Sequence, residues 1–181
     1  CIRDRRDTAH SVGCSTIRVT VQQNAMKDDT IDDIISKIDG KNVMLHISFE
    51  CIGGSTYQWQ NYFFGKQATR SRIEEHWRSF VLAVRKMMRV EKHARSVGAH
   101  VTLELNEFCA YWRLKVVAEL IELLGVYYAG KVDGCRQGLC SIRSSTWGMP
   151  CLKTYRMVST SLHVIEQLTV AVSYTHLTLP T

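Results

Sequence analysis

The sequence predicts an α/β domain with a mostly parallel, Rossmann-like sheet and helices on both of its faces. Two observations lead to this class. Segments rich in β-branched and apolar residues alternate along the chain with amphipathic helical patterns, which is typical of βαβ units. The helical patterns are also long enough to return the chain for a parallel strand, and such crossovers cover both faces of a sheet. The 181 residues, 45% of them hydrophobic, are enough for one domain with its own core.

The first elements lie in the N-terminal third of the chain. Residues 17–21 (IRVTV) form a β-branched run typical of a strand. A short helix is expected over residues 30–38, and residues 42–48 (NVMLHIS) predict a buried strand. A Gly-Gly pair then favours a loop over residues 49–61.

A long amphipathic helix follows and ends near Gly98. Its apolar side chains recur at helical spacing and predict the buried side: Ile73, Trp77, Phe80, Val84, Met87 and Met88. The opposite side carries a basic stripe at i, i+7, i+11 and i+14: Arg78, Arg85, Arg89 and Lys92. Residues 66–95 hold nine Lys/Arg against three Glu, which equals the whole net charge of +6. The stripe fits either a solvated outer face or a surface that binds nucleic-acid phosphates.

The remaining elements continue the alternation. A strand is predicted over residues 100–105 (HVTLEL), and a helix over residues 110–124 that ends at Gly125. Two extended segments and a last helix are expected after it, at residues 126–131, 155–160 and 161–168.

Two loops are expected at the carboxyl ends of strands, where ligands bind in parallel sheets. They cover residues 49–61 and 106–109. If the two preceding strands are neighbours, Cys51 and Glu104 lie at the same edge of the sheet.

The first of these loops carries a recognisable pattern. Its sequence over residues 48–55 is SFECIGGS, and it resembles the catalytic loop of the cytosine carbon-5 DNA methyltransferases, which reads Pro-Cys-Gln-Gly-x-Ser after a strand. Cys51, Gly53 and Ser55 match that pattern in order.

The second loop continues the resemblance. The segment at residues 104–106 (ELN) is loosely similar to the family's Glu-Asn-Val, and the resemblance covers about residues 42–124. It implies that the Cys51 thiolate adds to carbon 6 of a flipped cytosine, while Glu104 stabilises the charge that develops at ring nitrogen 3. It also implies a set of substrate-binding residues, with base stacking expected for the two aromatic ones: Gly53, Ser55, Tyr57, Trp59, Asn61 and Asn106.

The resemblance further implies S-adenosylmethionine as the methyl donor, bound by a Gly-rich turn upstream of residue 17. The expected partner is nucleic acid, DNA rather than RNA, and no membrane. The predicted function is therefore a methyltransferase-like nucleic-acid-modifying domain, active or degenerate. Two alternatives stay open: a non-catalytic nucleic-acid-binding module of a mobile-element polyprotein, and a different α/β enzyme that holds a metal at Asp133 and Glu104.

Three further expectations concern single residues and the compartment. The neighbouring carboxylate of Glu50 is expected to raise the pKa of the Cys51 thiol. His46 lies in a buried strand pattern, which favours a hydrogen-bonded core histidine over a catalytic base. The seven cysteines include no Cys-x-x-Cys pair, which favours a reducing, intracellular compartment over a disulfide framework or a zinc ribbon.

The two ends of the chain also lead to expectations. The chain starts with Cys1 rather than Met, so we expect a truncated domain over residues 1–171. Residues 172–181 (VSYTHLTLPT) resemble a translated sequencing adapter, so we expect a non-native tail there.

Overall fold

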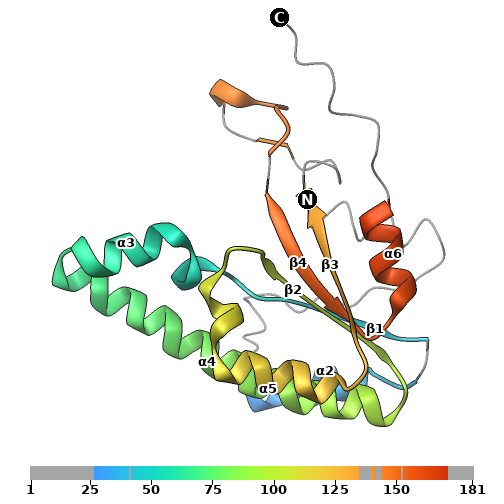
Figure 1. The fold of residues 1–181 in the computed structure, drawn as a ribbon. Coiled ribbons are helices and arrows are strands. Elements are labelled where there is room, and N and C mark those ends of the chain that lie inside the picture. The colour runs from blue at the N-terminus through green and yellow to red at the C-terminus, as the bar shows by residue number, and fades with distance from the viewer. Residues whose placement is uncertain (1–26, 41, 135–139, 142–143, 152, 171–181) are drawn as a thin grey trace, which may run out of the picture.

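The computed structural model describes residues 27–170 except 41, 135–139, 142–143 and 152. Four strands form one sheet in the order β1-β2-β4-β3 (Figure 1). The strands are β1 (Met44–Ser48), β2 (His100–Asn106), β3 (Tyr128–Asp133) and β4 (Thr154–Ser159). The α-helices of the described part are α2 (Asp28–Ser36), α3 (Thr56–Phe64), α4 (Gln67–Ser96), α5 (Lys115–Leu124) and α6 (Leu162–Val170).

The sheet is mixed, so the expectation of a mostly parallel sheet is only partly correct. β1 and β2 are parallel, with Ser48 opposite Glu104. β4 is antiparallel to both of its neighbours, β2 and β3. The described part of the connection between β3 and β4 contains no α-helix and includes the short 3-10 turn η5 (Ser144–Thr146). An antiparallel neighbour requires no crossover helix, and β4 accordingly returns beside β3.

Helices cover both faces of the sheet, as predicted. Successive residues of a strand point to opposite faces, and β4 shows this directly. Val158 belongs to the main core, which includes buried residues of α2, α4 and α5. Met157 packs instead with Val132 and Ile165, and Ile165 lies on α6. In Figure 1, α6 accordingly stands beside β3 and β4, away from α4 and α5.

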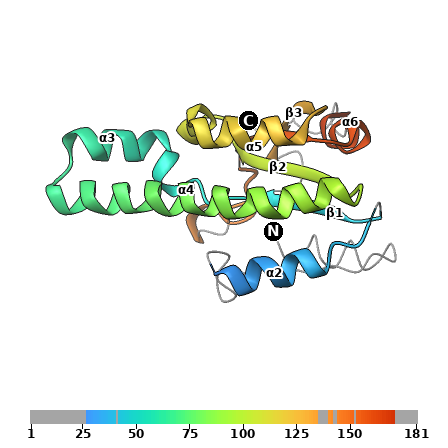
Figure 2. The ribbon, with the colours of Figure 1, turned by 90° about the horizontal axis from the view of Figure 1, so that it is seen from below.

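The long basic helix forms as expected, but the segment before it differs. A 3-10 turn, η2 (Ile52–Gly54), is followed by α3, so most of the predicted loop is helical. The N–H of Gln58 donates to the Ser55 side chain, which caps the start of α3. α3 and α4 pack against each other as a helical hairpin that extends beyond the sheet (Figures 1 and 2).

The other predicted elements agree with the structure to within a few residues. The helix expected over 110–124 starts with a separate 3-10 turn, η3 (Ala110–Arg113), before α5. Gly125 ends α5 with a φ of 68°, a conformation that favours glycine. The strand expected over 17–21 lies outside the described residues. None of the described helices is apolar over a length sufficient to cross a bilayer.

Candidate active site at the carboxyl edge of β1 and β2

Cys51 lies at the carboxyl edge of the parallel strand pair. It is the third residue after β1, and its Sγ accepts the backbone N–H of Asn106 at 3.5 Å. Asn106 is the last residue of β2. Since Glu104 stands opposite Ser48 in the same strand pair, Cys51 and Glu104 lie at the same edge of the sheet. Glu104 pairs with Met157 and so lies on the face that α6 covers, whereas Cys51 packs against the main core on the other face.

The surroundings of Cys51 favour its thiolate. A hydrogen bond with the thiol of Cys109 lowers the pKa of Cys51 to about 7, and the N–H of Asn106 and the charge of Lys153 act in the same direction. Burial and the carboxyl group of Glu104 act against them. The expectation, based on Glu50, that the pKa of Cys51 is raised is therefore wrong. The carboxyl group of Glu104 does act to raise the pKa, but the hydrogen-bond donors outweigh it. A thiol of this kind is half ionised near neutral pH.

The sequence analysis missed Cys109 and Tyr111, which pack beneath the Cys51 loop. A Cβ added to Gly54 would lie 2.5 Å from Cys109 Sγ, and one added to Gly53 would lie 2.4 Å from the Tyr111 hydroxyl oxygen. Both glycines are thus required because Cys109 and Tyr111 pack closely against the backbone of the Cys51 loop. The signal for Cys109 was its position, because it is the third residue after β2 as Cys51 is after β1.

Cys109 and Tyr111 both have raised pKa values. For the Cys109 thiol the causes are its hydrogen bond to Cys51 and then its burial, and for Tyr111 burial is the main cause. Cys51 is therefore the member of the thiol pair that ionises first.

Glu104 is buried and paired. Its side chain is 8% exposed, and its Oε2 lies 3.2 Å from Nε2 of His46. On the same face of the sheet, the hydroxyl groups of Thr102 and Ser159 lie 2.8 Å apart. His46 is therefore hydrogen-bonded as expected, but it is not a core residue: its side chain is 29% exposed, because β1 is an edge strand of the described sheet.

The polar residues predicted to bind substrate have local partners. Besides capping α3, Ser55 donates to the carbonyl of Ile52 at 3.3 Å. The side chain of Asn61 donates to that of Gln58 at 3.2 Å, and the side chain of Asn106 accepts the N–H of Phe108 at 3.1 Å. These contacts stabilise the helix start and the turn after β2, and their roles toward a substrate stay predictions.

The aromatic residues predicted to stack on nucleotides lie on α3. Tyr57 is 79% exposed, and the ring of Trp59 stacks on that of Phe63 at 5.7 Å. Trp59 also lies 5.7 Å from Trp77 of α4. The indole N–H of Trp77 donates to the carbonyl of Gly53 at 2.7 Å. The aromatic cluster is thereby joined to the loop that carries Cys51.

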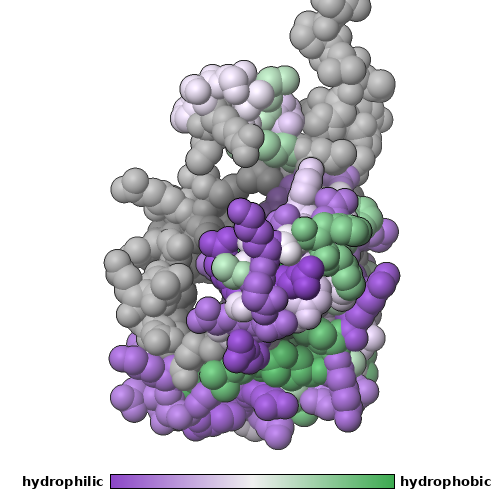
Figure 3. All heavy atoms as spheres, turned by 90° about the vertical axis from the view of Figure 1, so that its left-hand side faces the viewer, coloured by the Kyte–Doolittle hydropathy of each residue, from purple (hydrophilic) through white to green (hydrophobic). Residues whose placement is uncertain are grey.

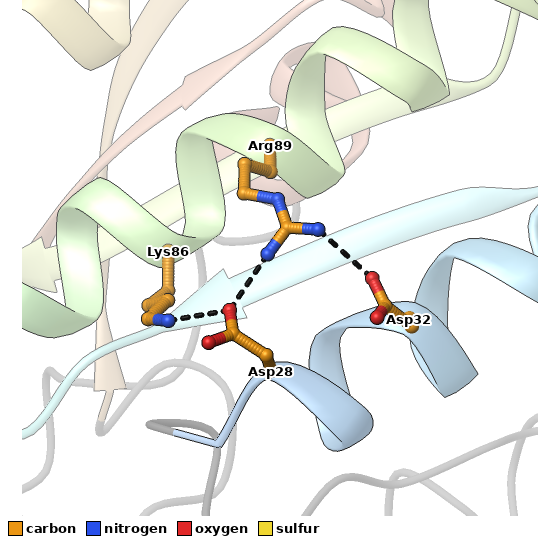
Figure 4. Close-up of polar contacts among 4 residues, drawn as sticks. All are labelled: Asp28, Asp32, Lys86 and Arg89. Atoms are coloured by element: carbon orange, nitrogen blue, oxygen red, sulfur yellow. Dashed lines mark hydrogen bonds and ion pairs between the residues drawn. The ribbon is translucent and has the colours of Figure 1, made fainter.

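The structure divides the predicted basic stripe. Arg89 donates to Asp28 at 2.7 Å and to Asp32 at 2.9 Å, and Lys86 also pairs with Asp28 (Figure 4). Asp28 and Asp32 of α2 thus already engage the guanidinium group of Arg89, and the role of Arg89 toward phosphate stays a prediction. Lys92 is exposed beyond this cluster.

Arg78 and Arg85 are exposed on α4, and neither forms an ion pair in the described part of the chain. They line a shallow hollow of about 330 Å³ together with Trp77, Val81 and Leu82.

The metal alternative does not fit the geometry. Asp133 accepts a hydrogen bond from Thr154 at 2.7 Å and lies on β3, with β4 between it and β2. Glu104 of β2 pairs with Met157 of β4, and Met157 pairs with Gly130 of β3. Asp133 therefore lies three residues further along β3 than the position level with Glu104. The two carboxyl groups are thus roughly 10 Å apart across the sheet and roughly 10 Å along it. No group of three metal-binding side chains occurs among the residues that the structure describes.

The expectation of S-adenosylmethionine rests on residues outside the described part of the chain. The Gly-Gly turn after β1 packs against Cys109 and Tyr111. The Gly-rich turn expected upstream of residue 17 lies outside the described residues.

No family model matches the chain, and neither a curated protein nor a solved structure does.

Proposed function

We propose that this chain is a methyltransferase-like domain that activates cytosine in a nucleic acid for methylation at carbon 5. One observation carries the proposal. The Cys51 thiol, whose Sγ accepts the N–H of Asn106, and the buried carboxyl group of Glu104 lie at the carboxyl edge of two adjacent parallel strands. These are the two groups that pyrimidine activation requires, at the place where α/β sheets bind ligands.

Cys51 acts as the nucleophile in this proposal, and Glu104 acts as the proton donor. The Cys51 thiolate forms a bond to carbon 6 of the ring, and the electron pair of the 5,6 double bond moves through carbon 4 to nitrogen 3. Glu104, in its acid form, donates a proton to nitrogen 3. The resulting enamine is nucleophilic at carbon 5. Carbon 5 first takes up an electrophile, which is a solvent proton when no methyl donor is present, and then loses its original hydrogen as a proton. Return of the nitrogen 3 proton to Glu104 and expulsion of the thiolate from carbon 6 restore the aromatic ring. The sequence resemblance implies S-adenosylmethionine as the methyl donor.

The order of the strands gives additional support. The sequence resemblance requires the nucleophile loop and the acid on adjacent parallel strands, and β1 and β2 are such a pair. Both connecting helices, α4 and α5, also pack on the same face of the sheet. In this comparison the nucleophile loop follows β1 and the acid lies on β2, as in the sequence resemblance.

Exchange of the cytosine carbon 5 hydrogen with solvent deuterium tests the proposal. Reversible addition of the thiolate makes carbon 5 accept a solvent proton, so the wild-type chain is expected to exchange this hydrogen in an oligonucleotide without any methyl donor. Cys51→Ser and Glu104→Gln should abolish or strongly slow the exchange, which mass spectrometry measures. Cys140→Ala, which removes an exposed cysteine, is the matched control and should leave it unchanged. Absence of exchange in the wild-type protein would overturn the proposal.

A non-catalytic nucleic-acid-binding module is the second candidate. The exposed Arg78 and Arg85 beside exposed aromatic rings favour it. In this case binding survives Cys51→Ala, weakens as salt increases and falls with Arg85→Ala, while no carbon 5 exchange occurs.

A further inference from the structure

We infer that the α3–α4 hairpin is a binding surface for single-stranded nucleic acid, with bases stacked on Trp59 and Phe63 and phosphates held by Arg78 and Arg85. The inference rests on the nucleic-acid partner of the proposed function. Beyond the proposed function, it specifies the α3–α4 hairpin as the binding surface and single-stranded nucleic acid as the ligand.

The hairpin exposes aromatic rings to an unusual degree. It projects beyond the sheet at one end of the molecule (Figures 1 and 2). Four of its aromatic side chains are strongly exposed: Trp59 at 40%, Phe63 at 58%, Tyr57 at 79% and Phe64 at 89%. Figure 3 views the molecule from this end and shows hydrophobic side chains gathered among polar ones. A cluster of this kind marks a binding surface.

The rings are held in place before any ligand binds. Trp59 and Phe63 are one helical turn apart and stack with an interplanar angle of 24°. Trp77 lies beneath Trp59, and its ring is also 4.8 Å from that of Tyr62. The hydroxyl group of Tyr62 donates to Glu74 at 3.2 Å. A stacking platform on two packed helices loses little side-chain entropy when a base binds to it.

The charges around the platform are complementary to phosphate. Arg78 and Arg85 line the hollow next to Trp77, and none of the residues that line it is acidic. Residues 55–85 contain five Lys/Arg and two Glu, and α3 contains no charged residue. A net positive surface disfavours a second copy of the same surface and favours a polyanion. Exposed aromatic faces further favour unpaired bases, because the faces of paired bases are already stacked.

The platform is also connected to the candidate active site. The hydrogen bond from Trp77 to Gly53 fixes the α3–α4 hairpin to the turn two residues after Cys51. A strand bound along the hairpin is therefore led toward the edge of the sheet where Cys51 lies.

Fluorescence anisotropy with a labelled single-stranded DNA oligonucleotide of mixed sequence tests the inference. We expect the single strand to bind more tightly than its duplex. Trp59→Ala should weaken binding about ten-fold or more, as expected for one lost base stack. Trp147→Ala removes an exposed tryptophan outside the hairpin, 73% exposed, and should have no effect.

The arginines are tested by the dependence of affinity on salt. Arg78→Ala and Arg85→Ala should each reduce the slope of log K against log salt concentration by about 0.7. Lys115→Ala removes a cation of α5 whose side chain is 92% exposed, and it should leave the slope unchanged.

Two further variants separate loss of binding from loss of folding. Trp59→Phe retains a ring and should keep most of the affinity, and Tyr57→Ala removes a ring that is 79% exposed without disturbing the core. The inference is overturned if Trp59→Ala and Trp147→Ala bind equally well. It is also overturned if Trp59→Ala only dissociates a dimer, as measured by sedimentation. Hydrogen exchange at carbon 5 is a separate measurement. Binding to the hairpin can therefore be absent while exchange occurs, and binding can occur while exchange is absent.

Discussion

The backbone N–H of Asn106 donates to Sγ of Cys51 at 3.5 Å and so joins the end of β2 to the loop after β1. Together with the hydrogen bond from Cys109, this contact lowers the pKa of the Cys51 thiol, although the thiol form itself donates to the carbonyl of Phe49 at 3.7 Å. The donor positions are set by β2 and by the turn after it, so the reactivity of Cys51 depends on residues more than fifty positions away.

The first prediction concerns the ionisation of Cys51. Its alkylation by iodoacetamide should show a midpoint near pH 7, because the thiolate is the reacting form and the pKa is about 7. Cys109→Ala removes the largest stabilising contact and should move this midpoint to higher pH. Peptide mass spectrometry of the modified Cys51 measures both. An unchanged midpoint in Cys109→Ala would show that the Cys109 contact does not control the ionisation.

The second prediction concerns Glu91, which the sequence analysis passed over. It lies on the buried side of α4 with 0% exposure, and neither carboxyl oxygen has a hydrogen-bond partner among the described residues. Burial raises the pKa of Glu91 to about 7, and the charge of Arg95 only partly opposes this.

The sign of the resulting pH dependence follows from the raised pKa. The native state keeps the Glu91 proton up to about pH 7, while the unfolded chain loses it near its ordinary value of 4.5. The free energy of unfolding therefore falls between these pH values, by about 3 kcal/mol in total, and stays constant above them. Glu91→Gln should lack this fall. Urea unfolding at both ends of the range measures it, with Glu75→Gln, an exposed residue of the same helix, as the control. Equal pH profiles for wild type and Glu91→Gln would contradict the prediction.

The third prediction concerns the glycine pair. Gly54→Ala should destabilise the fold by about 1–3 kcal/mol, because its Cβ would overlap Cys109 and Tyr111 in a buried contact. Cys109→Ala removes one of the two obstacles. The double variant should therefore be more stable than the sum of the single effects predicts, as measured by urea unfolding. Simple additivity would mean that the loop relieves the overlap by moving elsewhere.

The fourth prediction concerns the ion pairs between α2 and α4. Because Arg89 is engaged by Asp28 and Asp32, Arg89→Ala should reduce oligonucleotide affinity far less than Arg85→Ala does. It should instead lower Tm by at most a few degrees, and high salt should remove the difference, since the pairs are exposed. Anisotropy and thermal unfolding measure the two effects. A loss of affinity equal to that of Arg85→Ala would return Arg89 to the binding surface.

Local patterns predicted most of the elements because they report burial directly. The apolar spacing along α4 describes one packed face, and this helix formed where expected. The strand β1 also formed where expected, but the prediction that it is buried was wrong, because it lies at the edge of the described sheet and only Ile47 is buried. α3 was missed because its apolar residues stay exposed on a protruding hairpin, so burial did not shape its sequence. Glu91 could have been found, since it continues the spacing of Val84 and Met87 at i+7 and i+4.

The amino-acid sequence alone determined the alternation of strands and helices, the charge of α4 and the presence of Cys51 and Glu104 after or within neighbouring strand patterns. These are properties of short segments, whose preferences are set by side-chain size, polarity and spacing. Only the tertiary structure decided that β4 runs antiparallel, that α2 neutralises Arg89 and that Cys109 and Asn106 stabilise the Cys51 thiolate. Each of these depends on contacts between residues far apart in the chain, which no local pattern specifies.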